Sequence, residues 1–387
     1  MRARKVINGI RVVGGDCRAI VSREIGFYRV RPKIATLFLT YRCDSRCKTC
    51  SRWQLPQEQL AEWELDYDGW TIIIDKLAAA GIRVVEVFGG NVLLRKELLL
   101  QVLAGLHEKG MSIHLPTNQI GLDDEVAEAM ARYVDTVYVS TDGLPEQQNE
   151  IRGLDDASRN VVQAITRLTR ARENQGSCAR PVRLVCNCTV SRFNADVLEE
   201  LADYALLMGF DEIHYEYAGE FLPEDVARTR LDGVVPDPHY IRREQTILVD
   251  QDAAAGVKEA IRTIKKKFRD RPLRVATINI DTRSEESLWS GRIPHRKCYV
   301  MRNEVTVDPA GQIVLCPFIT NVGLGDLVAD AFDTIWDNAR HRRLRAQHDR
   351  GGMPMCATCI LGVERNPGIK QSLKRVYFTR IEPVLNR

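Results

Sequence analysis

The sequence lacks any long run of apolar residues. No stretch approaches the roughly 18 to 20 apolar residues that a membrane-spanning helix needs. Arg2, Arg4, Lys5 and Arg11 interrupt the N-terminus and leave no leader-like apolar block there. The sequence therefore predicts no membrane span and a cytoplasmic protein.

The sequence also lacks an excess of charge of either sign. Its 55 Lys and Arg residues against 52 Asp and Glu residues give a formal net charge of +3. This near balance offers no argument for a nucleic-acid or membrane partner. Basic runs at 263–271 and 339–345 are interpreted as solvated helix faces. The sequence contains no internal repeat and no low-complexity tract. Its apolar content of 44% is ordinary for a globular protein.

The chain is long enough for a large α/β domain with an appendage, because 387 residues are too many for one ordinary core. From about residue 34, short β-like runs such as "IATLFLT" alternate with helical patterns such as "RKELLLQVLAGLHEKG". Six strands separated by helices form a parallel sheet, which predicts a partial (β/α)6 TIM-like barrel. We expect four parts: an N-terminal extension at 1–33, the barrel at 34–220, a linker or helical segment at 221–275 and a small α+β domain at 276–387.

Eleven cysteines are present, and several are clustered. In a reducing compartment, clustered cysteines serve metal binding or catalysis rather than disulfides. Cys43, Cys47 and Cys50 follow the first predicted strand in "TYRCDSRCKTCSRW". Three thiolates on a [4Fe-4S] cluster, which usually takes four, leave one iron open for a bound molecule. The alternatives are three unrelated thiols or a zinc site, although zinc would need a fourth ligand and none is close in the sequence.

The spacing Cys-x3-Cys-x2-Cys after a first strand resembles the signature of the radical S-adenosylmethionine (radical SAM) superfamily. The resemblance implies that the amino and carboxylate groups of S-adenosylmethionine bind the open iron. It further implies cleavage to methionine and a 5′-deoxyadenosyl radical that abstracts a hydrogen atom from the substrate. An electron donor of the flavodoxin or ferredoxin type is implied as well. Thr49 departs from the family pattern, in which the residue before the third cysteine is often aromatic.

Three further segments resemble cofactor-binding segments of that family. "FGGNVLLRKE" is similar to a Gly-Gly-Glu-Pro segment that holds the amino group of S-adenosylmethionine, although Asn91 replaces the glutamate. "LPTNQ" resembles a third-strand Thr-Asn-Gly, and "VSTDGLPEQQNEIRG" resembles a segment whose Ser and Arg hold the methionine carboxylate. The residues that these resemblances assign to cofactor binding are Gly89, Gly90, Asn91, Asn118, Ser140 and Arg152.

A second cysteine group consists of Cys298, Cys316, Cys356 and Cys359. A hairpin between the first two, followed by a helix and the Cys-x2-Cys pair, resembles the C-terminal extension of the family called SPASM, or its shorter form, Twitch. Four thiolates then imply a fully ligated auxiliary [4Fe-4S] cluster, whose function is to pass an electron. A structural zinc is the competing assignment. Cys17 and Cys178 belong to neither group. Two roles stay open for them: buried free thiols or donors of a hydrogen atom.

The strand registers predict which side chains face the lumen of the barrel. Apolar residues that alternate along parallel strands face the helices, so the residues between them point inward. The residues predicted to point inward are Glu86, His114, Tyr138, Ser140, Asn187, Thr189, His214 and Glu216. We assign Asn187 to cofactor binding, and Glu216, His214 and Glu86 to catalysis. Glu216 is the first candidate for an acid, a base or a substrate anchor, because it is nearest the C-terminal mouth of the barrel. A purely structural role inside the barrel is the alternative for each.

These observations predict a radical SAM oxidoreductase acting on a polar small molecule, such as a sugar or an aminocyclitol. The expected reaction is a two-electron oxidation at a carbon that bears a hydroxyl or amino group. Epimerisation, dehydration and modification of a ribosomal peptide are alternatives within the family. No domain for binding a peptide leader is recognisable in 1–33, which makes modification of a ribosomal peptide the less favoured alternative. A non-catalytic zinc- or nucleic-acid-binding protein is the alternative from another class.

Overall fold

The computed structural model describes residues 31–175 and 181–361, apart from positions 239, 243, 278 and 296. Cys17, Cys178, most of the predicted N-terminal extension and the last 26 residues lie outside this range. The description below refers to the described residues.

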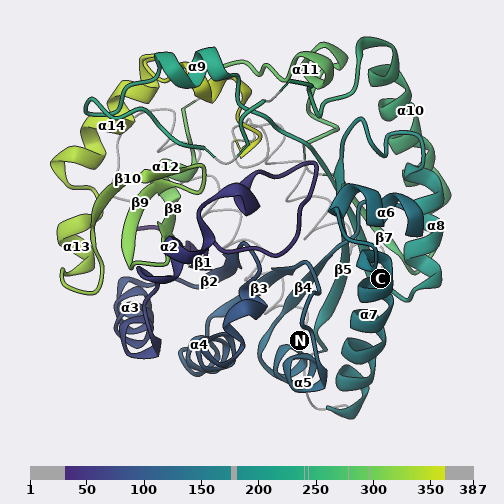
Figure 1. Cartoon of the computed structure of the whole chain (residues 1–387), viewed down its shortest axis with the longest axis horizontal. Coiled ribbons are helices and arrows are strands. Elements are labelled where there is room, and N and C mark those ends of the chain that lie inside the picture. Colours follow the sequence, from purple (N-terminus) through teal and green to yellow (C-terminus); the bar gives the residue numbers. More distant parts are fainter. Residues whose placement is uncertain are drawn as a thin grey trace, which may run out of the picture.

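The core of the fold is a curved sheet of six parallel strands that pair in chain order. These strands are β1 (Ile34–Thr40), β2 (Val84–Gly89), β3 (Ser112–Thr117), β4 (Thr136–Ser140), β5 (Arg183–Val190) and β6 (Glu212–Tyr217). The helices between them are α3 (Tyr67–Ala80), α4 (Lys96–Glu108), α5 (Asp124–Tyr133), α6 (Pro145–Arg152), α7 (Ala157–Asn174) and α8 (Leu198–Leu207). Helices α3, α4, α5, α7 and α8 line the outside of the curved sheet (Figure 1). The predicted partial (β/α)6 barrel is thereby confirmed.

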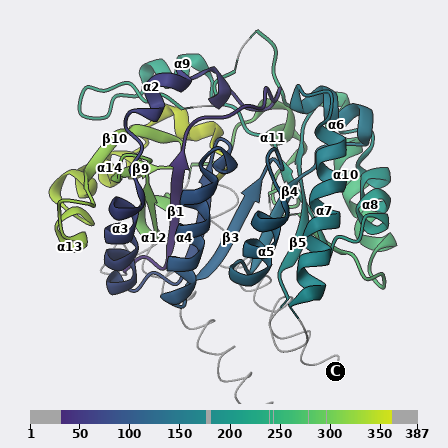
Figure 2. The same cartoon turned by 60° about the horizontal axis from the view of Figure 1, so that its bottom comes forward.

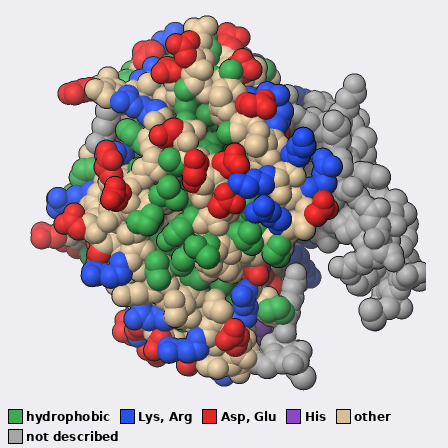
Figure 3. Space-filling model, turned by 90° about the vertical axis from the view of Figure 1, so that its right-hand side faces the viewer, with side chains coloured by type: hydrophobic (Ala, Val, Ile, Leu, Met, Phe, Trp, Pro, Cys, Tyr) green, Lys and Arg blue, Asp and Glu red, His purple; other side chains and the backbone are tan. Residues whose placement is uncertain are grey.

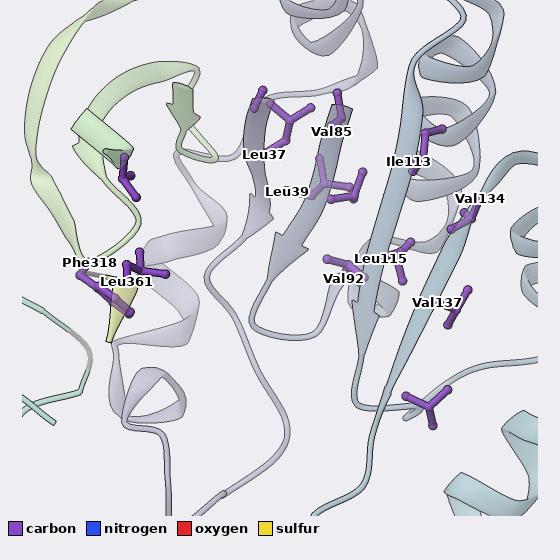
Figure 4. Packing of buried hydrophobic residues seen from close by; sticks show 14 of the residues in the cluster. Leu37, Leu39, Val85, Val92, Ile113, Leu115, Val134, Val137, Phe318 and Leu361 are labelled. Atoms are coloured by element: carbon purple, nitrogen blue, oxygen red, sulfur yellow. The ribbon is translucent and has the colours of Figure 1, made fainter. Parts of the chain in front are cut away.

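Sequence-local signals set the ends of these elements. Helix α3 begins after Asp66, whose carboxylate accepts a hydrogen bond from the Gly69 amide at 3.0 Å, and it ends at Gly81 in the left-handed region at φ 85°. The apolar residues of the strands alternate and pack under the helices. Figure 4 shows Leu37, Leu39, Val85, Ile113, Leu115 and Val137 side by side from four strands. The buried face of the sheet therefore follows the period of two seen in the sequence.

The sheet continues beyond the six barrel strands at both edges. Strand β7 (Arg274–Thr277) pairs with β6, and β8 (Glu304–Val307) pairs with β1, both in parallel. Strands β9 (Gln312–Cys316) and β10 (Ile319–Asp326) follow in antiparallel order and complete a ten-stranded sheet. The C-terminal hairpin is thus not a separate sheet, because Leu37 of β1 stands directly opposite Val307 of β8.

The segment 221–275 is more than a linker. It contains α9 (Pro223–Arg228), α10 (Gln251–Lys267) and β7. Helix α10 packs against α8, and α9 lies with α2 (Gln57–Ala61) above the end of the sheet toward which the parallel strands run (Figure 2). A strap at 240–249, described apart from position 243, precedes α10 and is fastened to the end of β6, because the Val249 amide donates to the Tyr217 hydroxyl at 3.0 Å. The segment 221–275 therefore contributes helices, a strand and a strap that contacts the end of β6.

Short helices complete the described chain. They are α11 (Glu285–Ser290), α12 (Val300–Asn303), α13 (Phe332–Ile335), α14 (Ala339–Asp349), η1 (Arg52–Gln54), η2 (Val92–Arg95) and η3 (Pro354–Thr358). Over the described residues, none of the helices combines the length and apolar character that crossing a bilayer requires. Figure 3 shows apolar side chains gathered in the middle of one face, with charged side chains around them.

Candidate active site

The loop with Cys43, Cys47 and Cys50 runs between β1 and α2 and is fastened to the C-terminal end of α6. The Lys48 amide donates to the Ile151 carbonyl at 2.8 Å, and the Arg46 amide donates to the Arg152 carbonyl at 3.2 Å. These bonds satisfy two carbonyls that the end of a helix leaves without partners. The cysteine loop is thus held by backbone bonds from the barrel wall.

Two glycines after β2 let the same loop pack tightly. A Cβ on Gly89 would lie 2.7 Å from the Thr40 carbonyl oxygen, and one on Gly90 would lie 2.0 Å from the Arg42 carbonyl oxygen. The sequence analysis assigned both glycines to cofactor binding, which stays a prediction. The structure adds a different reason for glycine, because the close neighbour is the chain's own loop beside Cys43.

Each thiol of this loop has a nitrogen donor beside it. The Asn118 Nδ2, the Arg152 Nη1 and the Arg52 amide lie 4.0, 3.9 and 3.4 Å from the sulfurs of Cys43, Cys47 and Cys50, respectively. Burial raises the pKa of Cys43 to about 12, and the charges of the other two cysteines act in the same direction. Three thiols on one loop, each facing a nitrogen donor suited to a thiolate, fit ligands of a positively charged iron centre.

Asn91, predicted to contact the amino group of S-adenosylmethionine, supports the cysteine loop. Its Oδ1 accepts from the Leu93 amide at 3.1 Å and caps η2. Its Nδ2 donates to the two carboxylate oxygens of Asp44 at 3.0 and 3.3 Å. The contact with the cofactor remains a prediction, and the structure adds a role in fixing the residue that follows Cys43.

Arg152 and Ser140, predicted to hold the methionine carboxylate, lie at the end of β4 and α6. Ser140 is half-buried and stands opposite Asn187 of β5. Arg152 forms an ion pair with Asp142, with 2.7 Å between Nη2 and Oδ2. The Arg152 Nε is buried and has no hydrogen-bond partner among the described residues. That Nε donor fits the predicted contact with the methionine carboxylate of the cofactor. The pairing of Arg152 with Asp142 had no signal in the sequence.

The predicted lumen residues do share the inner side of the sheet. The rings of His114, Tyr138 and His214 form a row with centroid separations of 6.1 and 6.2 Å. The alternate residues of β6 point outward, toward the helices. The hydroxyl of Tyr215 donates to the Leu198 carbonyl, and the hydroxyl of Tyr217 donates to the Leu288 carbonyl. The intervening His214 and Glu216 therefore point inward.

The inner residues of β2 and β5 follow the same register. Thr36 of β1 donates to the Glu86 carboxylate at 3.5 Å across the sheet. Cys186 and Cys188 are fully buried on the helix side, and burial raises the pKa of both thiols above their usual range. They are core residues, as the register predicts, while Asn187 between them is half-buried.

Tyr240 of the strap is a site residue that sequence reasoning missed. Burial raises the pKa of Tyr240, and the charges of Cys50 and Glu216 act in the same direction while Arg52 opposes them. Its hydroxyl is therefore within electrostatic reach of both the three-cysteine loop and the leading catalytic candidate. The residue lies in a stretch of the sequence without periodicity, so no pattern could have signalled it.

Glu220 holds the strap that carries Tyr240. Its buried carboxylate accepts from the Arg242 Nε at 2.6 Å and from the Ile247 amide at 3.1 Å. We expect Glu220→Ala to leave these donors without a partner at a cost of roughly 2 to 3 kcal/mol. Amide hydrogen exchange in 240–249, measured by mass spectrometry, should then be roughly 30- to 100-fold faster.

Glu224→Ala is the matched control, because Glu224 is an exposed acid on the neighbouring α9. Exchange in 240–249 should be unchanged in that variant. Equal exchange in Glu220→Ala and the control would show that Glu220 does not hold the strap.

The second cysteine group also converges in space. Cys298 precedes α12, Cys316 ends β9, and Cys356 and Cys359 lie at η3. Burial raises the pKa of Cys356 well above its usual range, and the charges of Cys359, Cys298 and Cys316 add to the effect. Four partly buried thiols within reach of one another fit the ligands of one iron–sulfur cluster, whose iron atoms replace their protons. No group of three or more His, Cys, Asp or Glu side chains among the described residues is arranged to hold a single metal ion.

Residues next to the four-cysteine group pack against the segment that follows β6 and against the strap. A Cβ on Gly219 would lie 2.0 Å from the Ile360 Cγ2, next to Cys359. The ring of Phe318, two residues after Cys316, packs edge-on against the rings of Phe221 and Tyr240. The ring centroids are 5.3 and 5.5 Å apart, respectively. Phe318 and Leu361 lie together apart from the barrel strands in Figure 4. The four-cysteine group therefore lies beside the strap that carries Tyr240.

Comparison with known families matches two parts of the chain. Residues 37–182 match the model described as the radical SAM superfamily. Residues 298–360 match SPASM, described as an iron-sulfur cluster-binding domain. The first range contains the three-cysteine loop, and the second contains all four cysteines of the other group.

Similar proteins have varied activities. The chain is 25% identical over 334 residues to the PqqA peptide cyclase of Streptomyces rochei, covering 83% of this chain and 79% of that protein. It is 27% identical over 205 residues to the tungsten-containing aldehyde ferredoxin oxidoreductase cofactor-modifying protein of Pyrococcus furiosus, covering 52% of this chain and 56% of that protein.

Solved structures share the fold. Streptococcus suis SuiB aligns with a TM-score of 0.61 at 14% identity, over 85% of this chain and 72% of that one. Native anSMEcpe with bound AdoMet and a peptide also aligns with a TM-score of 0.61 at 14% identity, over 92% of this chain and 98% of that one. At this identity the likeness is one of fold.

Proposed function

This chain is a radical SAM enzyme with a C-terminal SPASM domain, and we propose that it oxidises a polar substrate by two electrons at a carbon bearing a hydroxyl or amino group. Its cofactors are S-adenosylmethionine and iron–sulfur clusters. When bound, they supply a 5′-deoxyadenosyl radical that takes a hydrogen atom from the substrate, and an acceptor for the electron that the substrate then loses. We assign Cys43, Cys47 and Cys50 to one cluster, and Cys298, Cys316, Cys356 and Cys359 to the other.

The residues of the chain supply binding and proton transfer. We propose that Glu216 accepts the proton of the substrate hydroxyl or amine, while His214 and Glu86 orient the substrate in the lumen. Removal of one hydrogen atom, one proton and one electron converts the alcohol into a ketone or the amine into an imine. The electron for cofactor cleavage comes from a flavodoxin- or ferredoxin-type donor, which dithionite replaces in an assay.

One observation carries this proposal. Tyr240 is within electrostatic reach of Cys47, Cys50 and Glu216 and packs against Phe318 beside Cys316. We propose that the inward-facing carboxylate of Glu216 holds the substrate near the three-cysteine loop, where the substrate loses a hydrogen atom to one side and an electron toward the four-cysteine group. This arrangement supports oxidation over reactions that return the electron to the product.

The test uses the anaerobically reconstituted enzyme with S-adenosylmethionine, dithionite and metabolite fractions from cells grown in deuterated medium. A fraction that holds the substrate should transfer deuterium to 5′-deoxyadenosine. One product lighter by two hydrogens should form per S-adenosylmethionine consumed. An inverted, rearranged or unoxidised product would exclude the two-electron oxidation.

Glu216→Gln separates proton transfer from radical formation. We expect the rate of product formation to fall by about 100-fold, because the amide cannot accept the substrate proton. Formation of 5′-deoxyadenosine should continue. The comparison is Glu212→Gln, at the opposite end of β6, in which both rates should stay near those of the parent. Normal product formation in Glu216→Gln would remove Glu216 from the reaction.

Modification of a peptide is the second candidate. The PqqA peptide cyclase spans most of this chain, and anSMEcpe, of the same fold, is known with bound peptide. The peptide fraction of the same deuterated extract decides between the two. Deuterium transfer from that fraction alone would establish a peptide substrate in place of a small molecule.

A further inference from the structure

Asp142 and Arg152 form an ion pair in the wall behind the three-cysteine loop. The Asp142 side chain is completely buried, and that of Arg152 is 13% exposed. Removing two charges from water is costly, and the attraction between them often fails to offset that cost. A buried pair next to a cluster ligand therefore calls for a role other than stability.

Asp142 is held rigidly at the end of β4. Its Oδ1 accepts from the Thr189 amide at 2.8 Å, and its own amide donates to the Gln148 Oε1 at 2.7 Å. Its carbonyl accepts from the Asn194 Nδ2 at 2.6 Å. Three fixed contacts to neighbouring elements leave the carboxylate with one orientation, in which Oδ2 faces Arg152.

Arg152 joins that carboxylate to the cysteine loop. One terminal nitrogen, Nη2, lies on Asp142, and the other, Nη1, lies 3.9 Å from the Cys47 sulfur as its donor. The guanidinium of an arginine is charged at physiological pH, and its planar shape links the two groups.

We infer that Asp142 is a positioning residue that holds the Arg152 guanidinium against the Cys47 sulfur, and that this N–H···S contact raises the reduction potential of the cluster at the three-cysteine loop. The inference rests on the cluster assignment made above. Reduction adds negative charge to the cluster, and a cationic donor at a ligand sulfur stabilises the reduced form.

The test is a redox titration of the anaerobically reconstituted full chain, followed by electron paramagnetic resonance without substrate or S-adenosylmethionine. The signal of this cluster is the one that changes in the parent protein when S-adenosylmethionine is added. In Arg152→Gln, loss of one charge-assisted hydrogen bond should make reduction about tenfold less favourable, a shift of about 59 mV to lower potential.

Asp142→Asn distinguishes positioning from a simple effect of charge. Removal of a nearby negative charge alone would raise the potential, whereas release of Arg152 from the Cys47 sulfur lowers it. We expect a lower potential in Asp142→Asn. A higher one, or an unchanged potential in Arg152→Gln, would overturn the inference.

Two further variants guard against misfolding. The double variant Asp142→Asn/Arg152→Gln leaves no unpaired charge and should still show a lower potential than the parent protein, because it lacks the donor to the Cys47 sulfur. Arg172→Gln breaks the ion pair with Asp211, 2.8 Å apart at the other end of the strands, and should leave the potential unchanged. Because no turnover is measured, failure of the proposed oxidation would not alter these results.

Discussion

Cys50→Ala should lower the iron content of the anaerobically reconstituted protein by about half, from roughly eight to roughly four atoms per chain, and should abolish formation of 5′-deoxyadenosine. The three-cysteine loop has no spare ligand, since Cys43 and Cys47 are the other members of the set. Two thiolates cannot hold a cluster that already leaves one iron open. The measurements are iron and sulfide analysis and chromatography of the nucleoside after addition of dithionite.

Two control variants make the result specific. Cys186→Ala replaces a buried thiol of β5 that faces the helices and should leave both the iron content and the cleavage of S-adenosylmethionine unchanged. Cys316→Ala should also lose about half of the iron but still form 5′-deoxyadenosine. Retention of cleavage activity in Cys50→Ala, or zinc in place of iron in the parent protein, would contradict the assignment of the three-cysteine loop.

Gly90→Ala should disrupt the same loop without touching any sulfur. The added methyl group would lie 2.0 Å from the Arg42 carbonyl oxygen and 2.9 Å from the Cys43 Cβ. Main-chain atoms cannot swing aside as a flexible side chain does, so the loop must move. We expect occupancy of the three-cysteine cluster to fall below half and affinity for S-adenosylmethionine to fall more than tenfold, measured by iron analysis and equilibrium dialysis.

Gly256→Ala is the matched control, because it makes the same chemical change in α10 where a Cβ would meet nothing within 4 Å. This variant should keep its iron and gain roughly 0.5 to 1 kcal/mol of stability, since alanine is the better helix former. A Gly90→Ala protein with full iron content and unchanged affinity would show that the contact with Arg42 is relieved at little cost.

The sequence predicted the parts of the site that depend on local spacing. The period of two in "TVYVS" and "DEIHYEY" is enough to turn Tyr138, His214 and Glu216 inward, and the structure places them so. The grouping of the four later cysteines was also accessible, because a hairpin brings distant strand ends together. Strand register and cysteine spacing are short-range properties that a sequence carries directly.

Contacts between segments far apart in the chain were not accessible. Tyr240 reaches the cysteine loop because Glu220 and Tyr217 anchor a strap that has no regular pattern of its own. The partner of Arg152 was missed because Asp142 belongs to a turn where an acidic residue is ordinary. Asn91 was compared with a ligand-binding glutamate, whereas the structure shows its amide bonded to Asp44.

Strand β7 was missed for a related reason. Its four residues, "RVAT", follow a long polar helix and show no alternation that distinguishes them from a loop. Only the open edge of β6 makes them a strand, since Glu212 to Tyr215 supply the partners for all four. Pairing with the neighbouring strand, rather than the local sequence, makes these residues extended, and such tertiary contacts are not visible in a sequence pattern.

The parallel pairing of β1 with β8 makes the two cofactor-bearing parts one mechanical body. The strand that leads into the three-cysteine loop shares a ladder of backbone hydrogen bonds with the strand that follows Cys298. Neither part can tilt away from the other unless that ladder breaks, so we expect the distance between the two cysteine groups to stay constant. Cutting the chain between them would also strip β1 of a neighbour and leave its buried backbone exposed to pairing with other molecules.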